Sequence, residues 1–464
     1  MKVHWFKNVF FSCAMVGLAF PLFAQEQLAV FKEIVEHATT HNMGLKNAAL
    51  ETQKVGLERE AVKGKWLPSV SAHALYGYTN STMTLDLPTQ QLPIIGTQLF
   101  DGSQNVGISS QIALGGVTAT QVLFSGMQIS NGQKALEKKM EAQQLLRQAG
   151  HEEIARDIVA SFDQLMLLKE VEKLIDDTER RLDKERLRVV KAIENGLAIP
   201  YDRDKILLAM LEVQSRRAEV ESSRELLFFK LAEATGVEIE ELQLVSYTLE
   251  EIILPADAEL QMNRKELDAM RVAQQAHEYV LKKEKGAQLP MVFAFGNISY
   301  ANAFSSSMRF RDLPILGDPK LQSNSLRLAP NVLVGVGVKW DIFQGKTHRS
   351  AIERAKLDAQ INANNLADTE EKLSLLMRKT KADYELARRK VDVNRQQHKV
   401  AQNNLTLATR QFQEGLQSVT ERLEAENDYY KHSLAYYNQI LSQRSAAIEM
   451  LKSNGNLYQT IISN

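Results

Sequence analysis

The placement of proline constrains the fold of this chain more than any other feature. Ten prolines occur in 464 residues, at positions 21, 68, 88, 93, 200, 255, 290, 314, 319 and 330. None lies between residues 94 and 199 or after residue 330, and both intervals are rich in Ala, Leu and charged helix formers. Because proline breaks helix interiors, we predict single helices over residues 126–195 and 345–414. Each would be about 100 Å long at 1.5 Å per residue.

The two proline-free intervals belong to an internal duplication. Leu123-Phe124-Ser125-Gly126 recurs as Ile342-Phe343-Gln344-Gly345, Asn195-Gly196-Leu197 as Glu414-Gly415-Leu416, and Trp66-Leu67-Pro68 as Gln288-Leu289-Pro290. The first two motifs recur at an offset of 219 residues and the third at 222. The sequence therefore predicts two structural repeats, over residues 25–235 and 265–464, joined by a mixed segment at 236–264. Expected strands cover residues 68–80, 105–123, 290–302 and 331–343, and expected return helices cover 198–235 and 416–462.

The expected strands alternate between apolar and polar residues. Val332, Val334, Val336, Val338, Trp340 and Ile342 share one face of the last strand. In the first repeat the alternation loses phase at Gly115-Gly116, which predicts a bulge there. Tyr76, Tyr78, Tyr300 and Trp340 are candidates for a membrane aromatic girdle. An ordinary antiparallel sheet packed on a core would show the same alternation.

Four strands cannot close a membrane barrel. Three chains that contribute four strands each would form a twelve-stranded barrel. The long helices indicate a similar tiling, because the helix over residues 126–195 has two apolar stripes. One contains Ile154, Ile158, Leu165, Leu168, Ile175, Leu182, Val189 and Ile193, and the other contains Leu167, Val171 and Leu174. A helix with two apolar stripes has a neighbour on each side, which favours a cylinder of helices.

Composition excludes several classes of protein. Lys and Arg number 56 against 57 Asp and Glu, so no basic excess indicates nucleic acid as a partner. Residues 1–24 have the pattern of a secretory signal peptide, with Lys2 and Lys7 before an apolar run. The single cysteine, Cys13, lies within this peptide; lipidation of Cys13 is the alternative. Beyond residue 24 no run approaches the roughly 20 apolar residues of a membrane helix, so an exported chain of this kind would meet a membrane as strands.

The duplicated Leu-Pro, the duplicated Phe-x-Gly and the segment from Phe412 to Ala425 resemble the TolC family of outer-membrane efflux proteins. The resemblance implies a mainly helical fold with a membrane β-barrel. A homotrimer would form a 12-stranded outer-membrane β-barrel continuous with a 12-helix periplasmic α-barrel. Residues 26–42 and 236–264 resemble the belt around that tunnel. The implied function is the passive duct of a tripartite efflux or type I secretion system. The implied partners are outer-membrane lipid, a periplasmic adaptor, and an inner-membrane transporter of the RND, ABC or MFS type.

The resemblance also assigns candidate site residues. The adaptor would dock at the periplasmic tip, on the matching residues Asn195, Gly196, Leu197, Glu414, Gly415 and Leu416. A solvated helical hairpin explains the glycines as well, but explains an exposed Leu in both copies less readily.

The periplasmic gate and acidic constriction map onto Asp202, Phe412, Gln417, Glu421 and Glu424. Glu421 and Glu424 match the acidic rings of the family, where threefold symmetry would stack six carboxylates; a solvated helix face is the alternative. The arginine and tyrosine of the family gate are replaced by Gln417 and Phe412. Closure would then depend on packing or on other residues such as Arg203 and Arg422.

No motif of an enzyme, cofactor site or metal site stands out. His37 and His41 could share a metal, but two histidines alone rarely make a closed site. A periplasmic coiled-coil scaffold or adaptor is the alternative function. It would need no aromatic-flanked apolar strand faces.

Overall fold

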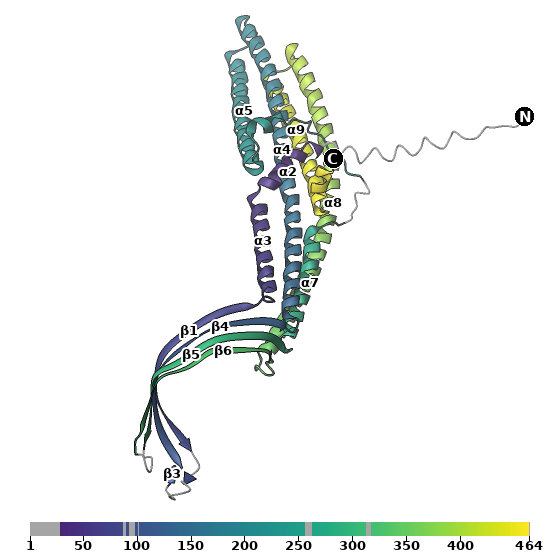
Figure 1. Cartoon of the computed structure of the whole chain (residues 1–464). Helices are drawn as coiled ribbons and strands as arrows, with labels where there is room; N and C mark the ends of the chain where they lie inside the picture. The colour runs from purple at the N-terminus through teal and green to yellow at the C-terminus, as the bar shows by residue number, and fades with distance from the viewer. Residues whose placement is uncertain are drawn as a thin grey trace, which may run out of the picture. The chain divides into compact units, whose positions relative to one another are not determined.

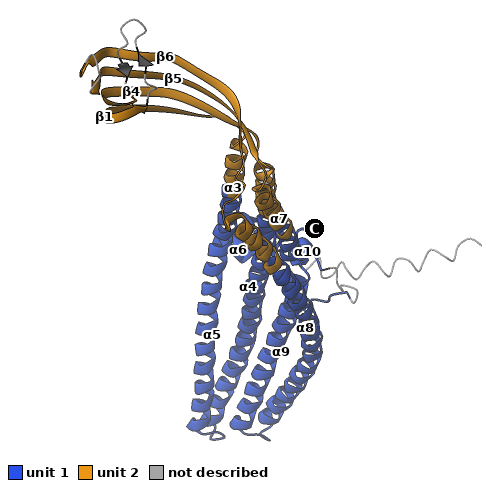
Figure 2. Cartoon of the chain, turned by 90° about the horizontal axis from the view of Figure 1, so that it is seen from below, with its two compact units in different colours: residues 1–54, 140–273, 362–464 blue, residues 55–139, 274–361 orange. Residues whose placement is uncertain are grey.

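The fold is described from a computed structural model, over residues 28–86, 90–91, 98–100, 102–255, 262–311 and 317–463. The expected signal peptide and Cys13 lie outside the described residues. The chain divides into two units, coloured separately in Figure 2. Unit 1 comprises residues 1–54, 140–273 and 362–464, and unit 2 comprises residues 55–139 and 274–361.

Unit 1 is helical. Its elements are α2 (Lys32–His41), most of α4 (Gln128–Glu194), α5 (Pro200–Thr235), α6 (Ile239–Leu244), most of α8 (Thr347–Gln413), α9 (Val419–Ser453) and α10 (Leu457–Ile462), with the first parts of α3 and α7, residues 43–54 and 265–273. Unit 2 contains a four-stranded sheet and the parts of α3 (Met43–Gly64), α4, α7 (Lys265–Gly286) and α8 adjacent to it in sequence. A two-stranded pair, β2 (Gln90–Gln91) and β3 (Gln98–Phe100), completes the described elements.

The two proline-free intervals form continuous helices. Helices α4 and α8 each have 67 residues, within two residues of the expected bounds. The apolar stripes expected on α4 are largely buried: Ile158, Leu165, Ile175, Leu182 and Val189 are at most 3% exposed, and Leu167, Val171 and Leu174 at most 8%. Ile154, Leu168 and Ile193 of the first stripe are half-buried against the same core. Helix α4 therefore packs on more than one neighbour, as two stripes require. The last return helix is shorter than expected, because α9 ends at Ser453 and Gly455, at positive φ, separates it from α10.

The sheet is antiparallel, in the order β1 (Ser69–Asp86), β4 (Ser103–Phe124), β5 (Met291–Arg311) and β6 (Lys320–Lys339) (Figure 1). Both strands of the second pair extend further from the helices than expected. The duplication holds in the register: Val70 pairs with Ala119, and the residues at the repeat offsets, Val292 and Val338, pair in the same way. The two hairpins are therefore equivalent, and the β4–β5 pairing joins the two repeats.

One face of the sheet is apolar and open. Val334 and Val338 on β6 are 77% and 68% exposed, and paired residues place Ile298, Val117 and Ala72 on the same face. The other face is mixed rather than polar throughout. It carries His73, Thr118 and Asn297, but also Phe293 and Phe295, which lie against Gly337 and Gly335 of β6.

The expected bulge at Gly115-Gly116 is wrong. Both neighbouring strands stay in register across these glycines. The nearest shift between β4 and β5 lies at Ser109/Gln111, opposite Ser305, whose φ is +52°. Gly116 is needed for close approach instead, because a Cβ there would lie 3.1 Å from the His73 ring and from the Ile298 carbonyl oxygen. The alternation changes phase because Ile112 and Leu114 lie on the mixed face.

The connecting segment is fixed to the long helices by buried polar side chains. Gln443 of α9 accepts from the Ile252 amide at 3.0 Å and donates to its carbonyl at 2.7 Å, and Tyr384 of α8 accepts from the Leu254 amide at 3.0 Å. Arg444 donates to the Glu250 carbonyl at 2.8 Å and forms a fully buried ion pair with Asp163 of α4. This segment therefore bridges the two repeats.

A partly buried carboxylate holds the C-terminal helix. Glu152 of α4 accepts from the amides of Leu457 and Tyr458, at 3.1 and 3.3 Å, at the start of α10. Burial raises the pKa of Glu152 to about 7, although these two amides and Arg264 act in the opposite direction. The docking of α10 therefore depends on a group that titrates near neutral pH.

Helices α4 and α7 approach closely through two glycines, which gives a stability prediction. A Cβ on Gly286 would lie 2.1 Å from the Gly126 carbonyl oxygen, which is backbone and cannot rotate away. Gly286→Ala should therefore lower the free energy of unfolding by about 1–3 kcal/mol. Gly132→Ala is the matched control, since its Cβ would meet only side-chain atoms, a Val62 methyl at 3.4 Å and Lys283 Cδ at 3.9 Å; there we expect a gain of up to about 1 kcal/mol. Thermal unfolding of both variants is the measurement, and equal midpoints would contradict the close approach.

Candidate functional site: the helical hairpin tips

The two hairpins between the long helices and their return helices share one turn geometry. Gly196 and Gly415 have φ of +69° and +74°, a conformation that favours glycine. The Leu197 amide donates to the Ala192 carbonyl at 2.7 Å, and the Leu416 amide donates to Gln411 at 2.8 Å. Gly196 and Gly415 donate to Ile193 and Phe412 at 3.0 and 3.1 Å. Both turns are therefore Schellman motifs.

Both tips present an apolar side chain to solvent. Leu197 is 83% exposed and Leu416 is 75% exposed, and Asn195 and Glu414 beside them are also exposed. Such a leucine usually packs back on its own helix in this motif. The structure thus places all six residues of the expected docking tip at the two turns, with both leucines free of the core.

Asp202 and Glu421 occupy the same position of the two repeats, at the first turn of α5 and of α9. The Glu421 carboxylate accepts from the Ser418 amide at 2.8 Å, while Ser418 Oγ accepts from the Glu421 amide at 3.3 Å. Asp202 accepts from the Ile199 amide at 3.4 Å, and its own amide donates to the Ile199 carbonyl at 3.0 Å, because Ile199 has no side-chain oxygen to cap it. Both carboxylates therefore cap helices, a role that the acidic-ring prediction did not include.

The remaining gate candidates do not form a link within the chain. Gln417 is half-buried, its Oε1 lacks a hydrogen-bond partner among the described residues, and Asp202 accepts instead from the Ile199 amide. Phe412 is half-buried and packs against the helical core. Glu424 is exposed one helical turn beyond Glu421. Closure by packing at Phe412 and an acidic constriction at Glu421 and Glu424 both stay predictions.

The four aromatic candidates are exposed but lie at two levels of the sheet. Tyr300 is mid-strand on β5, and its counterpart in the first repeat is Tyr78 on β1 near Tyr76. Trp340 directly follows β6 at the helix end, where its Nε1 donates to the Gln288 carbonyl at 3.0 Å. Nine residues of β5 separate the levels of Lys339 and Tyr300, about 30 Å of strand. The four aromatic residues therefore do not lie at one level of the sheet, as a single girdle would require.

Sequence reasoning missed a charge cluster between α4 and α9. Arg181 of α4 donates to both oxygens of Glu426 of α9, at 2.7–3.3 Å, and Arg422 pairs with the same carboxylate at 2.8 Å. Glu426 and Arg422 are 5% and 2% exposed. The spacing of Arg422 and Glu426, four residues apart on one helix, indicates an ion pair. The sequence contains no sign that both are buried or that Arg181 joins them.

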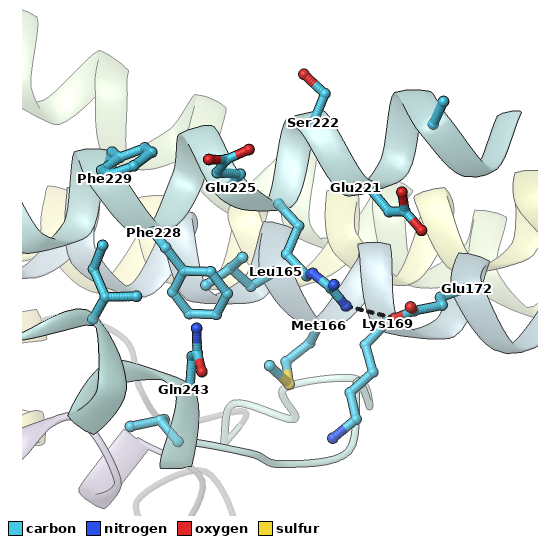
Figure 3. A pocket seen from close by; sticks show the side chains of 14 residues that line it. Leu165, Met166, Lys169, Glu172, Glu221, Ser222, Glu225, Phe228, Phe229 and Gln243 are labelled. Carbon is cyan, nitrogen blue, oxygen red and sulfur yellow. Dashed lines mark hydrogen bonds and ion pairs between the residues drawn. The ribbon is translucent and has the colours of Figure 1, made fainter. Parts of the chain in front are cut away.

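A groove of about 920 Å³ lies among α4, α5 and α6. Figure 3 shows Leu165, Met166 and Phe228 among its lining side chains. Glu172, also in the lining, pairs with Arg224 at 2.9 Å. No nucleophile and base lie within hydrogen-bonding reach of each other in this lining. His37, a metal candidate, donates from Nδ1 to the Thr235 carbonyl at 2.7 Å, and His41 lies against Gly236, so both act at the end of α5.

The described ranges contain neither a metal-binding cluster nor a membrane-spanning helix. No group of three or more His, Cys, Asp or Glu within them is arranged to hold a metal ion. Within the same ranges, no helix combines the length and the apolarity that a membrane crossing requires.

Comparison with known proteins tests the resemblance to the TolC family. Residues 258–456 match the sequence model of the family described as outer membrane efflux protein. The resemblance to the TolC family is confirmed. A search of curated protein sequences found no match.

Solved structures share this efflux-protein fold along nearly the whole chain. The outer-membrane channel OprN is similar with a TM-score of 0.70 and 16% identity, over 94% of this chain and 92% of OprN. CusC has a TM-score of 0.68 and 14% identity, over 92% of both chains. The outer membrane protein VceC of Vibrio cholerae has 0.67 and 15%, over 93% of this chain and 96% of VceC. The efflux-protein fold therefore includes the first repeat, which the family match does not cover.

The cap at Glu421 predicts a pH dependence. Hydrogen bonds from the Ser418 amide and hydroxyl lower the pKa of Glu421 below its ordinary value of 4.5. The stabilisation is therefore complete above pH 4.5 and is lost as the pH falls through the lowered pKa. Hydrogen exchange of the first turn of α9 should be faster in Glu421→Gln than in the wild type above pH 4.5, with the difference vanishing in acid. Glu424→Gln is the control, and faster exchange there would contradict the capping role.

Proposed function

We propose that three copies of this chain form an outer-membrane export duct, with a 12-stranded β-barrel and a 12-helix periplasmic α-barrel. The observation that carries the proposal is that the four-stranded sheet has an open edge on each side. Strand β4 of the first repeat pairs with β5 of the second, whereas β1 and β6 have an unpaired edge among the described strands. Open edges of 18 and 20 residues are templates for pairing with another chain.

The glycines at the helix ends repeat this pattern. Gly126, at the start of α4, is in close contact with Gly286, at the end of α7. Their repeat equivalents are Gly345 and Gly64, where an added Cβ would meet no other described residue within 4 Å. The same contact can form only if Gly345 of one copy meets Gly64 of the next. The open strand edges and the two unmatched glycines therefore both predict a second copy of the chain as the neighbour.

The open apolar face supports a membrane position for the strands. Its exposed valines would face lipid, and the two aromatic levels about 30 Å apart are close to the height of the apolar band of membrane barrels, about 25 Å, which has a girdle at both interfaces. Trp340 would lie at the interface nearer the helices and Tyr76, Tyr78 and Tyr300 at the other. The scaffold alternative leaves this face without a role.

We further propose that the tips dock a periplasmic adaptor, which connects the duct to an inner-membrane transporter of the RND, ABC or MFS type. The exposed Leu197 and Leu416 supply apolar contacts at turns whose backbone is fixed by hydrogen bonds. The OprN, CmeC and MtrE structures are those of outer-membrane channels. The duct itself would use no energy and carry out no catalysis, and cargo would be chosen by the transporter.

The duplication predicts the strand register between copies. Ala119 pairs with Gly296 inside the chain. The repeat offsets convert this pair into Val338 of one copy and Ala74 of the next. Val338→Cys with Ala74→Cys, in a Cys13→Ser background, should therefore form disulfides under mild oxidation and give a covalent trimer on a non-reducing gel. The control is Val338→Cys with Leu75→Cys, whose side chains lie on opposite faces. Monomers in both, or equal cross-linking, would contradict the proposed assembly.

The acidic constriction gives a second prediction. If Glu421 and Glu424 face the lumen, replacing both with Gln should reduce the preference for cations over anions in planar bilayers. Because Glu421 is engaged with Ser418, we expect Glu424→Gln to have the larger single effect. Glu414→Gln, at the tip, is the control for a general loss of surface charge. Unchanged selectivity in the double variant would remove both carboxylates from the pore.

A further inference from the structure

The groove among α4, α5 and α6 has an equivalent in the second repeat, between α8 and α9. The repeat offset of 219 residues converts three lining residues into three others: Leu165 into Tyr384, Arg224 into Gln443, and Glu225 into Arg444. The second set holds residues 250–254 of the connecting segment through their backbone. The groove of the second repeat is therefore filled by the chain itself. We call it the filled groove, and its counterpart in the first repeat the open groove.

The segment in the filled groove is extended. Backbone groups of Glu250, Ile252 and Leu254 make the hydrogen bonds to α8 and α9, so alternate residues bind. Ile252 and Leu254 are 0% and 7% exposed, whereas Ile253 between them is 54% exposed. Side chains of an extended chain point alternately to opposite sides. The filled groove thus recognises a backbone and buries every second side chain.

The open groove has the apolar surface for such a segment but no cover over it among the described residues. Ile448 of α9, at the filled groove, is 1% exposed, whereas its equivalent on α5, Phe229, is 55% exposed. Ala447 is 0% exposed, and its equivalent, Phe228, is half-buried. Two adjacent phenylalanines therefore line a space of about 920 Å³ that an extended peptide can enter.

Polar groups for a peptide backbone are also present. In the filled groove the Gln443 amide both accepts from and donates to Ile252. The lining of the open groove includes the exposed Gln243 of α6, which has the same amide, and the exposed Ser222 of α5. Figure 3 shows Phe228 reaching from α5 toward Gln243. A segment bound here would meet apolar and hydrogen-bonding side chains together, as the connecting segment does in the filled groove.

The charges at the two grooves are opposite. In the filled groove Arg444 donates to the Glu250 carbonyl, and Arg395 forms an ion pair with the Glu251 carboxylate. The residues at the repeat offset are two carboxylates, Glu225 for Arg444 and Asp176 for Arg395. The filled groove therefore suits an acidic segment, whereas the first repeat suits a basic one.

Other charges of the open groove agree with this difference. The exposed Glu221 of the lining replaces the apolar Ile440. The two cations of the lining are already engaged, because Lys169 donates to Ser246 at 2.7 Å and Arg224 donates to Glu172 at 2.9 Å. A bound segment would thus meet Glu221 and Glu225 as exposed carboxylates along α5.

We propose that the open groove binds an extended peptide segment of a partner protein, with alternate apolar side chains against Phe228 and Phe229 and basic side chains beside Glu221 and Glu225. The described part of the chain supplies one segment of this kind and uses it in its own second repeat. Because the open groove lies within a single chain, this inference does not rest on the export duct.

The connecting segment itself provides the probe. Two fluorescent peptides are titrated into the purified full chain in detergent, with empty micelles as the blank. One has the sequence of residues 248–255, and the other carries Glu250→Lys and Glu251→Lys. We expect the basic peptide to bind about tenfold more tightly than the acidic one, because only the basic peptide forms charged hydrogen bonds with the carboxylates of α5. Fluorescence anisotropy is the measurement.

Three variants test the residues of the groove. Glu225→Lys should reverse the preference in favour of the acidic peptide, which a general loss of structure would not do. Glu219→Lys is the matched control, since Glu219 is exposed on the same helix but lies outside the lining, and it should keep the wild-type preference. Phe229→Ser should weaken both peptides alike, because Phe229 offers apolar contact to either.

Equal affinity of the wild type for the two peptides, binding of neither, or a preference that persists in Glu225→Lys would overturn the proposal. Accessibility of the groove is tested with Ser222→Cys in a Cys13→Ser background. A maleimide should label this thiol in the purified assembly, and the basic peptide should protect it. A thiol that stays unlabelled without peptide would also overturn the proposal, because a second copy would then fill the groove. Absence of channel conductance would contradict the export duct and leave these readouts unaffected.

Discussion

Backbone hydrogen bonding between β4 and β5 is the interaction on which the rest of this structure depends, because it joins two copies of one sequence pattern. A sheet edge must be paired, covered or blunted. Within the chain, β4 of the first repeat pairs with β5 of the second. The equivalent edges, on β6 and β1, have no partner among the described strands. The glycines at the helix ends follow the same rule. Gly126 and Gly286 meet within the chain, whereas their repeat equivalents, Gly345 and Gly64, do not.

In the helical unit, the long helices must be held at one axial position although their hydrophobic stripes repeat along their length. Apolar stripes specify that helices pack but hold their axial position weakly, since a shift by one heptad preserves the pattern. The buried polar contacts supply the missing register. Asp163 with Arg444, Gln443 with Ile252, and Arg181 with Glu426 each bind α4 or the connecting segment to α9 at one defined height.

The sequence predicts the repeating features well and the particular ones poorly. Proline placement and apolar spacing set α4 and α8 to within two residues, because helix interiors exclude proline whatever lies around them. The Gly115-Gly116 bulge was wrong because glycine in a strand marks either a bulge or a close approach, and His73 and Ile298 decide between them only in three dimensions. The cap at Glu421 could have been found from the sequence, since Ser418 three residues earlier completes a capping box. The burial of Arg422 and its link to Arg181 could not, because nothing local distinguishes a buried charge from a solvated one.

The difference between the two return helices has a consequence for symmetry. Helix α9 begins at Ser418, whose side chain caps the Glu421 amide, whereas α5 begins at Ile199, which has no side-chain oxygen to cap the Asp202 amide. The two hairpins of one chain are thus alike in turn geometry but unequal in resistance to fraying, by about 1 kcal/mol for a missing cap. In a ring of three chains, six tips would alternate between a stiffer and a softer kind. The ring of tips would then have threefold rather than sixfold symmetry. Six identical partner molecules could not bind all six tips with equal affinity.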